Sequence, residues 1–234
     1  MDDVQKKLDE LVKNSDLFLA SPDTIQHLQE KGLPIKSVTQ TYSEYLDELF
    51  KKRRAQADEI INDLPLIDES IANATVQSLY EEFKESFLMG INGAAIVLAI
   101  LLLDLSAKYR LYEERLKKNP KASWTPIEEM LLGEVIRELR VHEAITETEE
   151  TALLSFNSKI RNNYLHYNIK KLVKGIIAEE LRGVNVKTGE EIIERNVKAE
   201  SRPHLWFFAK KVLDKKTIVE RTNFCIKWVN KLLG

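Results

Sequence analysis

The chain has 234 residues, of which 44% are hydrophobic and 31% are charged. This length suits one large domain, or one domain with an extension, and it allows a core to form without disulfides or metals. The single cysteine, Cys225, excludes an internal disulfide framework and any multi-cysteine zinc site, and it fits a reducing compartment.

The formal net charge of −2 conceals an uneven distribution along the chain. Residues 1–150 contain 18 Lys and Arg against 29 Asp and Glu, a net charge of −11, whereas residues 151–234 contain 17 against 8, a net charge of +9. The last third is therefore a cationic unit. Two explanations stay open: an anionic partner binds it, or the two parts of the chain attract each other within the fold.

The first segments predict helices. The start, "MDDVQKKLDELVKN", predicts a short amphipathic helix, and its early aspartates and broken apolar pattern do not fit a signal peptide. We therefore expect a cytoplasmic protein. In "SPDTIQHLQEKG", serine, proline and glycine stand in the order that helices favour. Helical apolar spacing then runs from Tyr42 to Leu64, where Pro65 ends it, and "KKRR" at 51–54 predicts a solvated turn.

A long apolar segment follows the helix expected in "DESIANATVQSLYEEFKESFLMG", which begins with an acidic cap and ends at Gly90. The uninterrupted apolar run from Ala94 to Leu103 covers only about half a bilayer crossing, and Asn92 and Asp104 bracket it. It therefore predicts a helix buried on all sides within a bundle, not a membrane span. This helix continues through "SAKYRLYEERLKK".

The rest of the chain is also mainly helical in prediction. After the loop "NPKASWTP", helices are expected from Thr125 to about His142 and from roughly 148 to 182, the latter with a break near Asn168. Weak alternation and a turn-like "KTGE" predict a small β-hairpin near residues 184–193. Two final helices follow, "SRPHLWFFAKKVL" and "KKTIVERTNFCIKWVNKLLG". The aromatic residues of 204–208 are expected in the core, and one apolar stripe runs along positions 218, 222, 225, 229 and 232.

Together these segments predict an all-α fold. Residues 1–64 form an N-terminal helical extension in this prediction, and residues 65–234 form the main helical bundle. Gly-rich phosphate loops, a GxSxG elbow and an HExxH pair are all absent from the sequence. The four histidines have no metal-ligand spacing with one another. An enzyme with this sequence is thus expected to work without a metal or a large cofactor.

One polar stretch, "KIRNNYLHYNIKK" at residues 159–171, combines groups that suit RNA cleavage. His166 can move a proton near neutral pH, Arg161 offers a fixed positive fork to phosphate oxygens, and Asn162 can orient either. On a helix, Asn162 and His166 share a face, and the long side chain of Arg161 can swing toward it. Lys170, Lys171 and Lys174 follow and can track a phosphate backbone.

The spacing alone is weak evidence. A second Arg-x4-His pair, Arg137 and His142, lies in the acidic part without the asparagine, and we interpret it as a solvated helix face. A hydrogen-bonded histidine at a polar helix end is also commoner than a catalytic one, so that explanation of His166 stays open.

The stretch "RNNYLH", after the helix "GINGAAIVLAILLLDLSAKYRL", resembles the HEPN superfamily over roughly residues 68–233. The signature of that superfamily is an arginine, a polar residue and, a few residues later, a histidine, here Arg161, Asn162 and His166. It follows a long apolar helix that begins with small residues around a glycine and ends in an acidic residue, here Gly93 to Asp104.

The resemblance implies an all-α bundle that dimerises so that two copies of the motif face one cleft. Many HEPN domains are metal-independent endoribonucleases in toxin–antitoxin, phage-defence or RNA-processing systems. It therefore implies catalysis by Arg161, Asn162 and His166, substrate binding by Asn163, Tyr167, Lys170 and Lys171, and RNA, a second copy and an antitoxin or defence-system protein as partners.

Two points from the resemblance bear on activity. Some HEPN domains only bind, so an inactive scaffold for RNA, nucleotide or a protein partner stays the alternative. In some toxins a tyrosine two residues after the histidine is modified by a partner nucleotidyltransferase. Asn168 holds that place here, which puts such a partner in doubt.

Overall fold

A computed structural model describes residue 30, residues 41–184 and residues 191–234. The helix predicted near 1–14, the helix predicted near 21–32 except residue 30, and the "KTGE" turn at 187–190 lie outside the described residues. The chain divides into two compact units, Met1–Lys51 and Lys52–Gly234. The boundary predicted after Leu64 stays a prediction.

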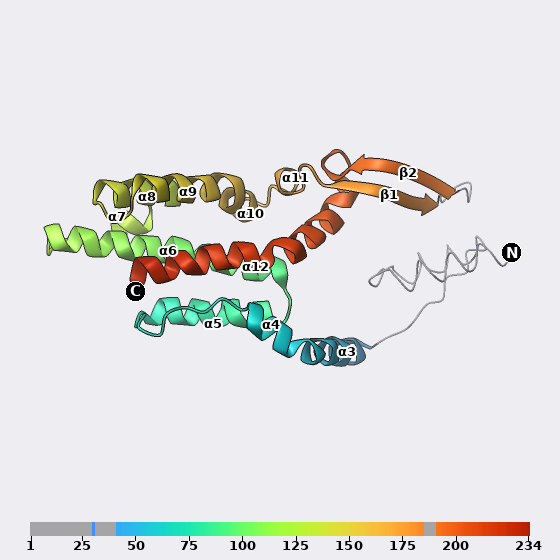
Figure 1. Ribbon diagram of the computed structural model, residues 1–234, viewed down its shortest axis with the longest axis horizontal. Coiled ribbons are helices and arrows are strands. Elements are labelled where there is room, and N and C mark those ends of the chain that lie inside the picture. The colour runs from blue at the N-terminus through green and yellow to red at the C-terminus, as the bar shows by residue number, and fades with distance from the viewer. Residues whose placement is uncertain (1–29, 31–40, 185–190) are drawn as a thin grey trace. The chain divides into compact units, whose positions relative to one another are not determined.

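The described chain is mostly helical and carries one small antiparallel hairpin, which confirms the predicted fold class (Figure 1). Its elements, in chain order, are α3 (Tyr42–Ala55), α4 (Ala57–Asp63), α5 (Ala74–Leu88), α6 (Asn92–Lys118), α7 (Thr125–Glu128), α8 (Leu132–Val141), α9 (Glu147–Phe156), a π-helical turn (Asn157–Arg161), α10 (Asn162–Leu165), α11 (Ile169–Leu172), β1 (Ile177–Val184), β2 (Glu191–Lys198), two 3₁₀ turns (Ala199–Ser201 and Pro203–Leu205) and α12 (Trp206–Leu233).

Helix α6 is the central element of the larger unit. It packs against α5, α8 and α12, and it continues to Lys118 as the sequence predicts. Buried residues follow one another too closely for a single helix face, including Leu102, Leu103 and Asp104. The burial is not complete, because Leu101 is 37% exposed. Within the described parts of the chain, no helix has the length and apolar character that a membrane crossing requires.

Helix α12 is a single helix of 28 residues, where the sequence predicted two. No glycine or proline interrupts "VLDKKT", so the backbone hydrogen bonds continue through it. The predicted stripe at 218, 222, 225, 229 and 232 is buried as expected. Burial raises the pKa of the Cys225 thiol, which fits an unreactive core residue.

The aromatic residues at the start of α12 differ from their prediction. Trp206 packs against a small cluster built on Val173, Ala199 and Ala209, but Phe207 and Phe208 are 64% and 60% exposed. Successive residues of a helix point about 100° apart, so only part of this run can face the cluster.

The helix predicted over 148–182 is wrong beyond Leu172. Helix α9 ends at Phe156, and a π-helical turn and α10 follow it without a gap. The helical structure then breaks at 166–168 and resumes briefly as α11. Residues 177–184 instead form β1, which pairs antiparallel with β2 from Ile177 opposite Lys198 to Val184 opposite Glu191. The hairpin is therefore confirmed but starts earlier than predicted, because "IAEEL" pairs with the strand that follows it and its helix propensity is overridden.

Other boundaries also moved. Helix α5 begins at Ala74, where the Asn73 side chain accepts bonds from the next amides, and not at Asp68. The helix predicted from Thr125 to His142 is split into α7 and α8. The run 51–54 lies in the last turn of α3 and does not interrupt that helix; within it, only Arg53 is half-buried.

Candidate functional site

The backbone around the motif is irregular. Asn157–Arg161 form one π-helical turn, α10 supplies a single α-helical turn, and His166 is its C-terminal cap residue. The His166 amide donates to the Asn162 carbonyl at 3.1 Å, so these two residues are one helical turn apart, as predicted. An extra residue in a helical turn re-aims the side chains that follow, and such turns are frequent at functional sites.

Arg161 is held by two partners. Its Nη2 donates to Asp104 Oδ2 at 3.0 Å, and its Nη1 donates to Asn162 Oδ1 at 3.0 Å. Both Arg161 and Asp104 have side chains only 13% exposed, so solvent screens this ion pair little. Lys108 Nζ lies 3.9 Å from the other oxygen of Asp104. Two cations therefore share one carboxylate, and the local charge stays positive.

In this geometry the Arg161 side chain reaches Asn162, as the sequence predicts. Asp104 lies within α6, which runs on for more than three turns beyond it, and it is the counter-ion of Arg161.

His166 is exposed, in contrast to the arginine. The structure therefore brings Arg161 and Asn162 into contact and places His166 on the next turn, open to solvent. An exposed imidazole on a positively charged surface can reach a ligand without moving the core.

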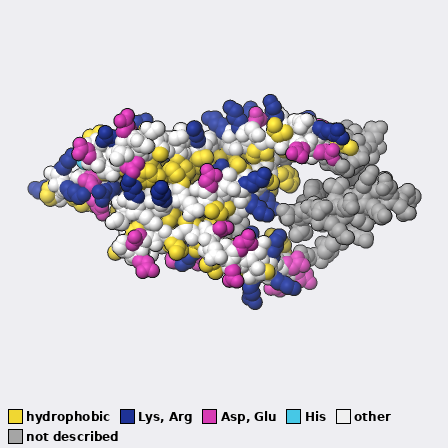
Figure 2. All heavy atoms as spheres, in the orientation of Figure 1, with side chains coloured by type: hydrophobic (Ala, Val, Ile, Leu, Met, Phe, Trp, Pro, Cys, Tyr) yellow, Lys and Arg dark blue, Asp and Glu magenta, His cyan; other side chains and the backbone are white. Residues whose placement is uncertain are grey.

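The predicted substrate-binding residues differ in how exposed their side chains are. The Asn163 side chain is half-buried and donates to the Lys159 carbonyl at 2.7 Å. Tyr167 is 62% exposed, and Lys170 and Lys171 are exposed on α11, with Lys174 just beyond it. Dark blue side chains gather over the region of α10 and α11 in Figure 2. Four of these residues are therefore accessible to an anionic ligand, whereas Asn163 is tied to its own turn.

A buried polar cluster, which was not predicted from the sequence, joins α10 to α12. The Tyr164 hydroxyl donates to Asp214 Oδ1 and accepts a bond from Arg221 Nη1, and Lys210 bonds the second oxygen of Asp214. Burial raises the pKa of Tyr164, and its bond to Asp214 raises it further, against the opposing effect of Arg221.

A signal for this cluster exists in the sequence. Residues 210, 214 and 221 are spaced by four and seven, which places them on one helix face. The sequence predicted two separate helices here, so residues 210 and 221 were not expected to share a helix face. Gly93 in α6 faces the same cluster: a Cβ there would lie 3.0 Å from Asp214 Oδ2 and 3.1 Å from Lys210 Nζ.

The second Arg-x4-His pair has the opposite exposure. Arg137 is exposed, as predicted, but the His142 side chain is only 11% exposed, which contradicts the predicted solvated face. His142 follows the last residue of α8, where the chain turns back against the bundle. The two pairs have the same spacing but different environments. The histidine is the accessible residue in the pair Arg161 and His166, whereas the arginine is the accessible residue in the pair Arg137 and His142.

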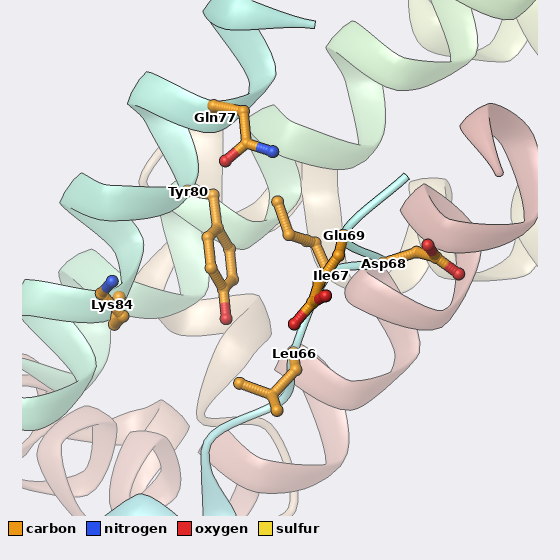
Figure 3. A pocket seen from close by; sticks show the side chains of 7 residues that line it. All are labelled: Leu66, Ile67, Asp68, Glu69, Gln77, Tyr80 and Lys84. Carbon is orange, nitrogen blue, oxygen red and sulfur yellow. The ribbon is translucent and has the colours of Figure 1, made fainter. Parts of the chain in front are cut away.

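A pocket of about 360 Å³ lies away from the motif, between the segment that precedes α5 and α5 itself (Figure 3). Two of its polar side chains are already bonded to that segment. The Tyr80 hydroxyl donates to the Pro65 carbonyl at 3.1 Å, and Gln77 Nε2 donates to the Ile71 carbonyl at 2.7 Å. This pocket therefore serves mainly to seat the segment on α5.

Among the described residues, no group of three or more His, Cys, Asp and Glu side chains is placed to hold a metal ion. Comparison of the chain with protein-family models, with curated proteins and with solved structures gave no match.

Proposed function

We propose that the chain is a cytoplasmic, metal-independent endoribonuclease of the HEPN type. The observation that carries the proposal is the arrangement of the motif: Arg161 is bonded both to Asn162 and to Asp104, about one turn before the exposed His166. Fixed cations beside a free imidazole on a basic surface suit phosphodiester chemistry more than any other reaction that these residues support.

The proposed reaction uses the 2′-hydroxyl of the RNA as nucleophile. A histidine acting as base removes the proton of that hydroxyl, and its oxygen attacks the adjacent phosphorus. The bond to the 5′-oxygen breaks, and an acid returns a proton to that leaving oxygen. The products are a 2′,3′-cyclic phosphate and a 5′-hydroxyl end. In this scheme His166 moves protons, Arg161 stabilises the developing phosphorane charge, and Asn162 orients the arginine.

A homodimer completes the proposed site. Base and acid are two roles, and a single chain offers one exposed histidine in the motif. A second copy would add its own histidine and arginine across the same phosphate. We also propose a protein partner that restrains the activity, such as an antitoxin or another component of a defence system.

One observation favours a second candidate function. Two nitrogens of Arg161 already bond to groups of its own chain, and the side chain is only 13% exposed. The remaining N–H groups of this guanidinium are hard for a phosphate to reach, because the side chain is so little exposed and its Nε is itself buried. An inactive scaffold that binds RNA, nucleotide or a protein partner through the exposed surface of α10 and α11 is therefore the alternative.

The test is RNA cleavage by the purified protein in EDTA, with end-group analysis of the products. We expect cyclic-phosphate ends, and we expect His166→Ala and Arg161→Ala each to lower the rate by at least about 100-fold. Arg137→Ala is the matched control, because it alters the exposed arginine of the other Arg-x4-His pair. Circular dichroism establishes that the variants remain folded.

Normal cleavage by both motif variants would exclude the proposed site. RNA binding without cleavage by the wild-type protein would favour the scaffold instead.

A further inference from the structure

The turn after α10 contains an unusual residue. The Asn168 amide donates to the Asn163 carbonyl at 2.8 Å, and the Tyr167 amide donates to the Tyr164 carbonyl at 3.1 Å. These two bonds define a Schellman motif, in which the residue after the cap adopts left-handed backbone angles. Tyr167 occupies that position with a φ of 48°.

Glycine usually fills this position, because a Cβ in the left-handed region crowds the following carbonyl. The same motif ends α5 in this chain, and there the residue is Gly90, with a φ of 67°. A tyrosine in that conformation makes the folded protein less stable than a glycine at the same position would. Such conformations cluster at functional sites, but Glu143 and Asn196 of this chain adopt them too. The backbone of Tyr167 therefore points to a function only together with the surroundings of its side chain.

The surroundings of Tyr167 indicate what its ring can do. The ring is 62% exposed, directly follows His166, and precedes the exposed lysines Lys170 and Lys171. An exposed ring with exposed cations three and four residues later is typical of surfaces that hold single-stranded nucleic acid, where bases stack on the ring and the cations follow the backbone.

We infer that Tyr167 is a stacking platform for an unpaired base beside the scissile phosphate, and that the substrate is therefore single-stranded RNA. This inference rests on the proposed function. In a duplex, the faces of each base are covered by its neighbours, so the ring has no face to stack on. In a single strand, every base offers a π-face, and the preference is for strandedness and not for sequence.

The experiment measures binding without cleavage, in the full chain carrying His166→Ala and in EDTA. Fluorescence anisotropy follows a labelled single-stranded RNA and the same RNA annealed to its complement. Tyr167→Gly removes the ring and relieves the left-handed backbone, whereas Tyr167→Trp keeps an aromatic face. Glu143→Gly is the matched control, because Glu143 ends α8 in the same motif with a φ of 58°.

We expect Tyr167→Gly to weaken single-strand binding by about 5- to 100-fold, while Tyr167→Trp binds within about twofold of the parent. Both glycine variants should melt about 2–4 °C higher than the parent, because each relieves the same conformation. Only the change at Tyr167 should alter binding. Higher stability with weaker binding separates a role in recognition from a role in the fold.

Equal binding of single-stranded RNA by Tyr167→Gly and its parent would overturn the inference, as would duplex binding as tight as single-strand binding. The proposed function fails separately. If wild-type protein binds single-stranded RNA through Tyr167 and does not cut it, the stacking platform stands and the ribonuclease does not. If it cuts RNA and Tyr167→Gly binds and cuts normally, the reverse holds.

Discussion

The guanidinium of Arg161 donates a hydrogen bond of 3.0 Å to the carboxylate of Asp104, which lies 57 positions earlier in the chain. The bond joins the motif to the central helix α6, and both side chains are 13% exposed. It gives the arginine a fixed place and at the same time neutralises much of its charge. The behaviour of this pair therefore bears both on the stability of the fold and on the choice between ribonuclease and scaffold.

Asp104→Asn should destabilise the protein by about 2–4 kcal/mol, because the arginine is left largely buried without its counter-ion. Arg161→Met in the same chain should recover part of that loss, since the uncompensated charge is then gone. Urea denaturation of the two single variants and the double variant measures the coupling. Losses that simply add in the double variant would show that the pair is not coupled.

Tyr164→Phe should cost about 1–3 kcal/mol near pH 7, because it removes a buried hydroxyl and leaves the groups that bond it without that partner. The cost should shrink at high pH. The folded-state pKa of Tyr164 is raised above its ordinary value near 10. Above that pH the unfolded tyrosine therefore loses its proton while the folded one keeps it. The unfolded state then binds fewer protons, so the stability of the wild-type protein falls as pH rises.

The variant lacks that ionisation, and the stability gap between the two proteins should narrow from pH 8 to pH 11. Urea midpoints at several pH values test this. A gap that stays constant across the range would contradict the raised pKa.

Gly90→Ala should destabilise the protein by about 1–2 kcal/mol, because its φ of 67° disfavours any side chain. A Cβ there would also overlap the guanidinium of Arg53, but that group is the far end of a flexible side chain and can swing aside. Gly175→Ala is the matched control, because its φ is 83° and no atom lies within 4 Å of the added Cβ. We expect the two losses, measured by urea denaturation, to agree within about 1 kcal/mol. A clearly larger loss at Gly90 that is recovered on addition of Arg53→Ala would show that the guanidinium cannot move.

Lys170→Ala and Lys171→Ala should each weaken RNA binding and flatten its salt dependence. A lysine that neutralises one phosphate of a single strand contributes about 0.7 to the slope of log K against log salt, and its removal takes that contribution away. Anisotropy titrations at several salt concentrations measure the slope. Lys121→Ala, in the exposed loop before α7, is the control and should leave the slope unchanged. If only the control variant has a flatter slope, or if none of the three variants does, Lys170 and Lys171 do not contact the RNA backbone.

Local signals predicted much of the helical framework. The short apolar run between two polar residues identified α6 as a bundle helix, glycine marked the end of α5, and the stripe along the end of α12 is buried as expected. These features depend on residues within one or two turns of each other, so the sequence contains what decides them. The same reasoning located the motif at 161–166 and the lysines after it.

Contacts beyond a few helical turns decided the rest. Residues 177–184 favour a helix locally, yet they pair with the next segment, 191–198, as a strand. The exposure of Phe207 and Phe208, and the low exposure of the His142 side chain, depend on which faces of their helices the rest of the bundle covers.

The motif itself divides in the same way. Its composition and order are written in the sequence, including the tyrosine after the histidine. The ion pair of Arg161 with Asp104 and the bond of Tyr164 to Asp214 join residues 57 and 50 positions apart. Spacing cannot predict such pairs, because loop closure lets many partners meet and only the packing of whole helices selects one. The sequence therefore determined which groups are present, and the tertiary structure decided which of them are held in place and which remain free.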